Sequence, residues 1–188
     1  LPVQMASGDN NAFTNNDYTD FYITLPKDNL ETALWLESDR MEGLDITPAK
    51  LEAEKKVVIE EFRQRYLNQP YGDQTMLLRA LAYKVHPYRW AAIGLATDHI
   101  AGATLADVES FYRTHYRPSN AILSISADME EKRMLELAEK WFAPLADHPS
   151  ETAAIPQEPV QTQARRQEVE RDVPASTVTV IHVSILTL

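Results

Sequence analysis

The sequence contains no cysteine among its 188 residues, which excludes disulfides, thiolate metal ligands and a cysteine nucleophile. It also lacks a run of 18 apolar residues, so no membrane-spanning helix is predicted, and Leu1 opens no signal-peptide pattern. Basic residues are few: 18 Lys and Arg face 28 Asp and Glu, giving a net charge of −10 and a pI of about 4.9. Arg165–Arg166 is the one basic cluster, so a nucleic-acid-binding surface is not expected.

The apolar residues that are present, 44% of the chain, suffice for a core. Short alternating segments predict a hairpin from Asn11–Thr14 and Thr19–Leu25, and a later strand at Ala121–Ala127. Between and after these segments, apolar residues recur at helical spacing. The pattern predicts an α+β fold with an antiparallel sheet packed against helices.

A polar segment with three prolines, residues 146–166, predicts a linker. Residues 167–188 then alternate in polarity, and Pro174 separates two predicted strands there. We therefore expect residues 1–145 to form part of one domain and residues 167–188 to begin a second, truncated one. We interpret both ends of the sequence as truncation points within a longer protein.

The residues Leu51–Arg65 predict a helix, since they are strong helix formers and include neither Gly nor Pro. Within it, a stripe at helical spacing places two valines between Glu54 and Glu61, on what should be the buried face. Carboxylates there need an ion pair, a shifted pKa or a metal ion. Because about 10 Å of helix separates the two α-carbons, both carboxylates could hardly bind one zinc.

Five segments occur in a characteristic order: NNAFTNNDYTDFY, LETALWLESDRM, EAEKKVVIEE, HPYRWAAIG and FYRTHYRPSNAILSISAD. Together they resemble the pitrilysin/insulinase family of zinc metallopeptidases, the inverzincins, whose zinc motif is H-x-x-E-H. The resemblance covers about residues 8–142 and extends weakly to residue 188. It implies a metallopeptidase half-unit fold, a peptide substrate and a second related domain or subunit, within one chain or in a homo- or hetero-dimer.

The resemblance also implies roles for particular residues. Glu61 matches the glutamate that binds zinc downstream of H-x-x-E-H, and Glu54 matches the one that supports the site without touching the metal. The NAFT segment matches the edge strand along which substrate lies, so Asn11, Ala12, Phe13 and Thr14 would contact substrate by strand addition. An ordinary core strand is the alternative interpretation of this segment.

The chain departs from the family pattern in one respect, because it contains no H-x-x-E-H. In the family that motif, with its general base, lies upstream of the NAFT strand and would precede Leu1. One hypothesis is therefore a zinc endopeptidase present as an incomplete fragment, inactive alone because a catalytic zinc needs three protein ligands. The alternative is a non-catalytic homologous subunit that binds substrate or a catalytic partner.

The remaining histidine and serine candidates are interpreted as structural. His86, in the family-like HPYR segment, is assigned a structural role, since a lone histidine is more often satisfied by hydrogen bonds than by metal. Ser124 and Ser126 have no accompanying His–Asp pattern, so a serine hydrolase is not expected. The sequence does not identify the compartment; of the cytoplasm and the bacterial periplasm, we expect the periplasm, which the acidic, cysteine-free composition slightly favours.

Overall fold

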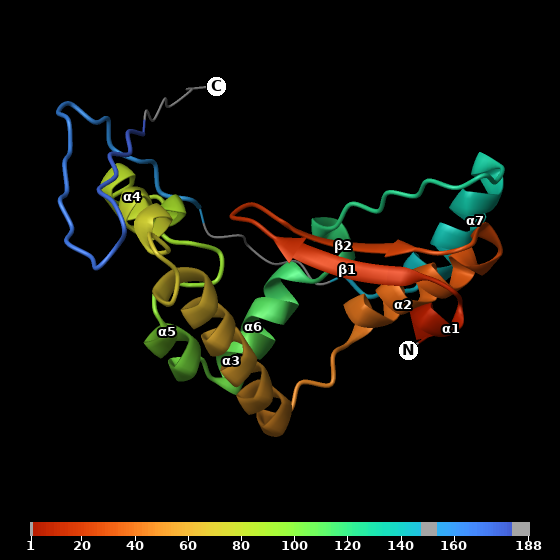
Figure 1. Cartoon of the computed structure of the whole chain (residues 1–188). Helices are drawn as coiled ribbons and strands as arrows, with labels where there is room; N and C mark the ends of the chain where they lie inside the picture. Colours follow the sequence, from red (N-terminus) through yellow and green to blue (C-terminus); the bar gives the residue numbers. More distant parts are fainter. Residues whose placement is uncertain (1, 148–153, 182–188) are drawn as a thin grey trace. The chain divides into compact units, whose positions relative to one another are not determined.

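The computed structural model describes residues 2–147 and 154–181 (Figure 1). The chain divides into two compact units. Unit 1 comprises residues 1–48 and 104–152, and unit 2 comprises residues 49–103 and 153–188. In the described part of the chain, no helix is both long and apolar enough to cross a membrane.

The described residues of unit 1 contain a β-hairpin and four α-helices. Its elements are α1 (Pro2–Met5), β1 (Asp9–Thr14), β2 (Thr19–Thr24), α2 (Leu30–Glu42), α6 (Leu105–His115) and α7 (Glu131–Phe142). Unit 2 contains α4 (Gln74–Ala82), α5 (Thr97–Gly102) and most of α3 (Pro48–Phe62), which continues as a π-helical turn, Arg63–Leu67. Helices and an antiparallel hairpin together confirm the α+β class.

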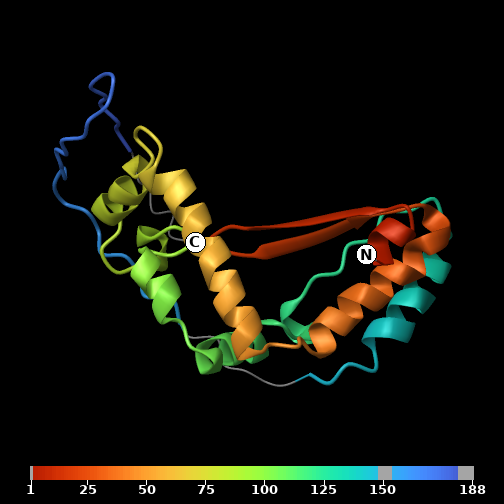
Figure 2. The ribbon, with the colours of Figure 1, turned by 60° about the horizontal axis from the view of Figure 1, so that its bottom comes forward.

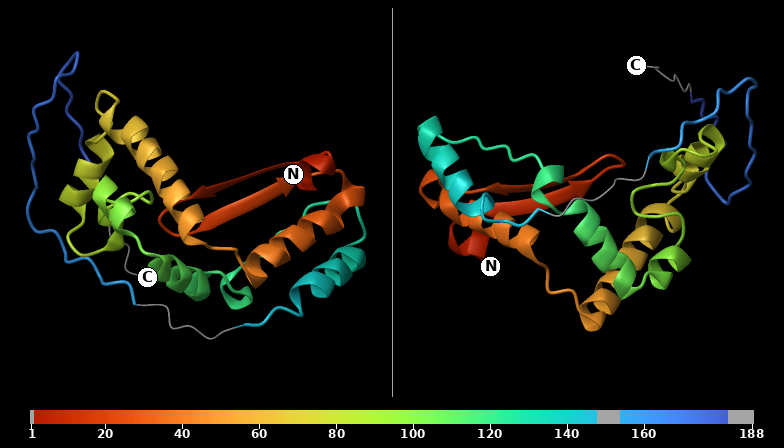
Figure 3. Two further views of the ribbon diagram at one scale, coloured as in Figure 1. Left: turned by 90° about the horizontal axis from the view of Figure 1, so that it is seen from below. Right: turned by 180° about the vertical axis from the view of Figure 1, so that it is seen from behind.

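The predicted hairpin is confirmed, with β1 and β2 antiparallel and paired from Asp9 opposite Thr24 to Thr14 opposite Thr19 (Figure 3). The turn forms because the Asn15 side chain accepts hydrogen bonds from the backbone N–H groups of Asp17 and Tyr18, at 2.8 and 2.9 Å. Among the described residues the sheet contains these two strands alone.

The core of unit 1 lies between α2 and α7, where Leu34 and Leu137 are 3% and 4% exposed. The α7 indole of Trp141 donates a 3.2 Å hydrogen bond to Glu31 on α2, and Lys140 forms an ion pair with the same carboxylate. These contacts lower the pKa of Glu31, chiefly through the Lys140 hydrogen bond. Apolar packing and one shared carboxylate therefore hold α7 to α2.

The hairpin packs on α2 and α6 through aromatic and cationic side chains. The Arg40 guanidinium lies 4.4 Å from the centre of the Phe21 ring, and the Tyr112 hydroxyl donates a 2.7 Å hydrogen bond to the Arg40 carbonyl. Tyr116 contacts both Phe21 and Tyr112. Burial raises the pKa of the Tyr116 hydroxyl and outweighs the opposing effect of Arg40.

Two predicted strand regions have no strand in the structure. Residues 121–127 form no ladder, and neither do residues 167–181, the described part of the second region. The alternating pattern of Ala121–Ala127 is still visible, because Ile125 is half-buried whereas Ile122 is 98% exposed. A strand needs a neighbouring backbone to bond with, and the described residues supply none beside this segment.

Candidate functional site

The helix α3 carries the predicted metal ligand. It begins at Pro48, where a first-turn proline costs no hydrogen bond, and its residues favour a helix throughout (Figure 2). A second stripe on the helix carries larger apolar groups: Phe62 is 3% exposed and its ring centre lies 5.2 Å from that of Tyr66. This stripe forms the buried face of α3.

The prediction that Glu54, Val57, Val58 and Glu61 form the buried face is therefore wrong for the described chain. Glu54 is exposed, Val57 is 60% exposed, and Val58 and Glu61 are half-buried. Spacing predicts which residues share a face, but the bulkier aromatic stripe decides which face is buried. The stripe of two carboxylates and two valines, named here the α3 stripe, is thus exposed at Glu54 and Val57 and half-buried at Val58 and Glu61.

The Glu61 carboxylate forms an ion pair with Arg65 one turn along the helix, at 2.7 Å between Oε1 and Nη2. The two side chains are 42% and 66% exposed. An exposed pair at this spacing stabilises a helix by only about 0.3–0.5 kcal/mol, so Arg65 is a weak competitor for the carboxylate. Among the described residues, no three His, Cys, Asp or Glu side chains are grouped to hold a metal ion. Glu61 can therefore supply one ligand, and the described residues do not complete the set.

The predicted substrate strand is β1, whose six residues are all exposed, as an edge strand requires and a core strand does not. The Ala12 N–H donates a 2.8 Å hydrogen bond to the Asn11 side chain and takes no part in the pairing with β2. Phe13 is 47% exposed and contacts Tyr18 edge to face. The strand belongs to unit 1, whereas Glu61 belongs to unit 2.

His86 is structural, as predicted. Its Nδ1 accepts a 3.1 Å hydrogen bond from the Tyr88 N–H and caps the short helical turn that follows. Its ring also packs against Tyr83 and Tyr88. This nitrogen is therefore engaged by the backbone of the turn that it caps.

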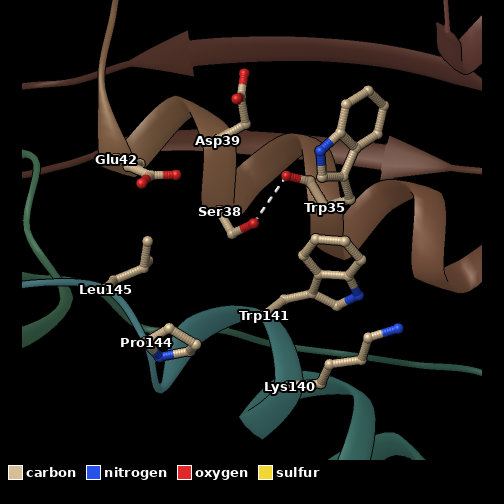
Figure 4. A pocket seen from close by; sticks show the side chains of 8 residues that line it. All are labelled: Trp35, Ser38, Asp39, Glu42, Lys140, Trp141, Pro144 and Leu145. Atoms are coloured by element: carbon tan, nitrogen blue, oxygen red, sulfur yellow. Dashed lines mark hydrogen bonds between the residues drawn. The ribbon is translucent and has the colours of Figure 1, made fainter.

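A hollow of about 250 Å³ lies between α2 and α7 (Figure 4). Its lining comprises Trp35, Ser38, Asp39, Glu42, Lys140, Trp141, Pro144 and Leu145. The Ser38 hydroxyl donates a 2.8 Å hydrogen bond to the Trp35 carbonyl, and Lys140 is paired with Glu31. The hollow includes no histidine and no nucleophile–base pair. Sequence reasoning missed it because its two walls lie about a hundred residues apart, but its chemistry marks no catalytic centre.

Comparisons with known proteins agree with the predicted family. Residues 102–185 match the family described as the peptidase M16 inactive domain. The chain is 33% identical over 172 residues to the zinc protease PqqE of Helicobacter pylori, covering 90% of this chain and 38% of the relative. It is 23% identical over 142 residues to cytochrome b-c1 complex subunit 1 of Bos taurus, covering 72% and 28%.

Solved structures give the same result. A protease from Helicobacter pylori superposes with a TM-score of 0.80 at 34% identity, covering 87% of this chain and 39% of that one. The first half of the periplasmic protease PqqL from Escherichia coli superposes with a TM-score of 0.67, covering 79% and 32%, and at 24% identity it supports the fold alone. The chain thus spans well under half the length of these relatives. With its motif order, its α+β fold and these relatives in agreement, the chain belongs to the pitrilysin/insulinase family of peptidases, M16.

Proposed function

We propose that this chain is part of a zinc-dependent endopeptidase that acts on extended peptides. The observation that carries the proposal is the α3 stripe, in which the half-buried Glu61 carboxylate follows a 60% exposed Val57 and a half-buried Val58. An apolar pair between carboxylates is suited to packing against a further segment that brings cations or a metal. The zinc proteases among the relatives support this interpretation.

In the proposed site, Glu61 is the one metal ligand from this chain's described residues, and a segment before Leu1 supplies H-x-x-E-H. Glu61 fits this role because its side chain is 42% exposed and its ion-pair partner among the described residues, Arg65, is itself 66% exposed. Glu54, two turns earlier, supports the site through hydrogen bonds without touching the metal. Bound zinc would lower the pKa of a water molecule and so provide a nucleophile at neutral pH.

Substrate binding is assigned to the free edge of β1. A peptide in extended form would add as a third strand, with the backbone of Asn11, Ala12, Phe13 and Thr14 as its partner. The Ala12 N–H is suited to this task because its present acceptor, the Asn11 side chain, can rotate away. In strand addition the hydrogen bonds form with the backbone of the peptide rather than with its side chains. This mode of binding therefore favours unfolded segments of varied sequence.

Replacing Ala12 with Pro tests this assignment, because proline has no N–H to donate. We expect kcat/KM for peptide cleavage by the natural protein to fall at least about tenfold, because the hydrogen bond from residue 12 to the substrate backbone is lost. Ala12→Gly is the matched control, since it keeps the N–H and should retain most activity. Equal activity in the two variants, with equal thermal stability, would remove β1 from the substrate site.

A non-catalytic subunit of the same fold is the second candidate. It is favoured by the similarity to a subunit of the cytochrome b-c1 complex. Either candidate works with a second related domain or subunit, as a homo- or hetero-dimer or within one chain. For the compartment, the proposal keeps the periplasm, which suits the acidic, cysteine-free composition.

Zinc content and peptidase activity of the natural protein distinguish the two candidates. The endopeptidase should contain one zinc per site, cleave a fluorogenic extended peptide, lose activity with a chelator and regain it with added zinc. A protein that binds the same peptide without zinc and without cleavage is instead the non-catalytic subunit.

A further inference from the structure

The segment that contains most of the predicted linker binds α4 closely. Residues 154–181 belong to unit 2, contain no helix or strand, and contact α4 and the residues at its two ends at separate points, with the chain looping away from α4 between them (Figure 1). Within this segment Glu158 is only 8% exposed, which is unusual for a carboxylate on a chain without secondary structure. Burial of such a group requires hydrogen-bond donors close to it.

Three consecutive backbone N–H groups supply those donors. Lys84, Val85 and His86 donate to the Glu158 carboxylate at 2.7, 2.9 and 2.9 Å. These residues follow the end of α4, so their N–H groups have no place in its hydrogen-bond ladder. Burial alone would raise the pKa of Glu158, but these donors and Arg165 outweigh it and hold the pKa below its usual value.

Arg165 donates hydrogen bonds to backbone carbonyl groups at the end of α4. One guanidinium nitrogen donates to the carbonyls of Leu81 and Ala82, at 2.9 and 2.8 Å, in the last turn of α4. Helix carbonyls at this end carry partial negative charge, so a cation is favoured there. A carboxylate therefore binds the N–H groups beyond α4, and a guanidinium binds the carbonyls just before them.

We propose that Glu158 and Arg165 form a latch that closes residues 154–166 onto α4 as a single conformational unit. Opening the latch would release both the segment and the Lys84–Arg89 loop. Further contacts at the other end of α4 support this: Arg171 pairs with Asp73 at 2.6 Å. The latch therefore holds residues 154–166 against the part of unit 2 that contains α4. This proposal is independent of zinc and of peptide cleavage.

Glu158→Gln is the sharpest test, because it keeps the shape of the side chain but replaces one acceptor oxygen with a donor. In the natural protein, we expect amide hydrogen exchange at Lys84, Val85 and His86 to accelerate at least about tenfold, as for loss of charge-assisted hydrogen bonds. Trypsin cleavage after Arg165 and Arg166 should accelerate by a similar factor. The control is Glu170→Gln on the same segment, where the side chain is exposed and should change neither rate.

A second variant tests whether the two side chains act as one latch. Arg165→Gln leaves Glu158 intact, yet the proposal expects faster exchange at residues 84–86 in this variant as well. Circular dichroism and the thermal midpoint establish that each variant is folded. Exchange at wild-type rates in folded Glu158→Gln, or acceleration confined to Glu158→Gln and absent from Arg165→Gln, would overturn the proposal.

Discussion

Replacement of Glu61 with Gln in the natural protein is expected to remove bound zinc and peptide cleavage together. A glutamine amide is a poor zinc ligand, because zinc in proteins is held by thiolates, imidazoles and carboxylates. For Glu54→Gln, which removes a group that supports the ligands, we expect a loss of roughly 10–100-fold in kcat/KM. The loss for Glu61→Gln should be larger. Metal analysis of the purified variants and cleavage of a fluorogenic peptide provide the two measurements.

Glu60→Gln is the matched control for this experiment. Glu60 neighbours Glu61 on α3 but lies off the α3 stripe, where it faces Arg63 at 3.8 Å between exposed side chains. Its replacement should leave zinc content and activity unchanged, since an exposed ion pair of this kind contributes at most about 1 kcal/mol. A Glu61→Gln variant that retains zinc and activity like the control would remove Glu61 from the metal site.

Leu137→Ala is expected to destabilise unit 1 by about 2–5 kcal/mol, the range for truncating a buried leucine. Leu137 is 4% exposed on α7 and faces α2, so the change leaves a cavity in the main helix–helix contact of this unit. Chemical denaturation monitored by circular dichroism gives the change in the free energy of unfolding.

Leu135→Ala provides a control of the same residue type on the same helix. Leu135 is 56% exposed, so its truncation should change the free energy of unfolding by no more than about 0.5 kcal/mol. Equal destabilisation by the two changes would contradict the assignment of Leu137 to the core and would place the core of unit 1 elsewhere.

Much of the fold could be predicted from local patterns, because those patterns act through neighbouring residues. The hairpin followed from two alternating segments around Asn15–Tyr18. The capping box at the start of α6 is equally local, with the Thr104 N–H donating to the Asp107 carboxylate at 2.8 Å. The buried stripe of α7 follows helical spacing in the same way, since Leu137 is buried and Trp141 half-buried.

The errors arose where the outcome depends on distant residues. A strand at Ala121–Ala127 requires a paired neighbour, which its own sequence cannot reveal. The orientation of α3 depended on competition between two stripes, and the one that includes Phe62 is buried. The Glu158 contacts join residues more than seventy positions apart, although a Glu and an Arg in a proline-containing polar segment gave a faint signal.

The residues before Leu1 in the natural protein provide the most direct test of the proposed zinc site. Intact mass measurement and sequencing of N-terminal peptides would identify them. The proposal expects an H-x-x-E-H motif in that segment, which would supply two histidines to join Glu61 and a glutamate as general base. A mature protein that begins near Leu1, or an upstream segment without the motif, would contradict the endopeptidase proposal and leave a non-catalytic subunit of the same family.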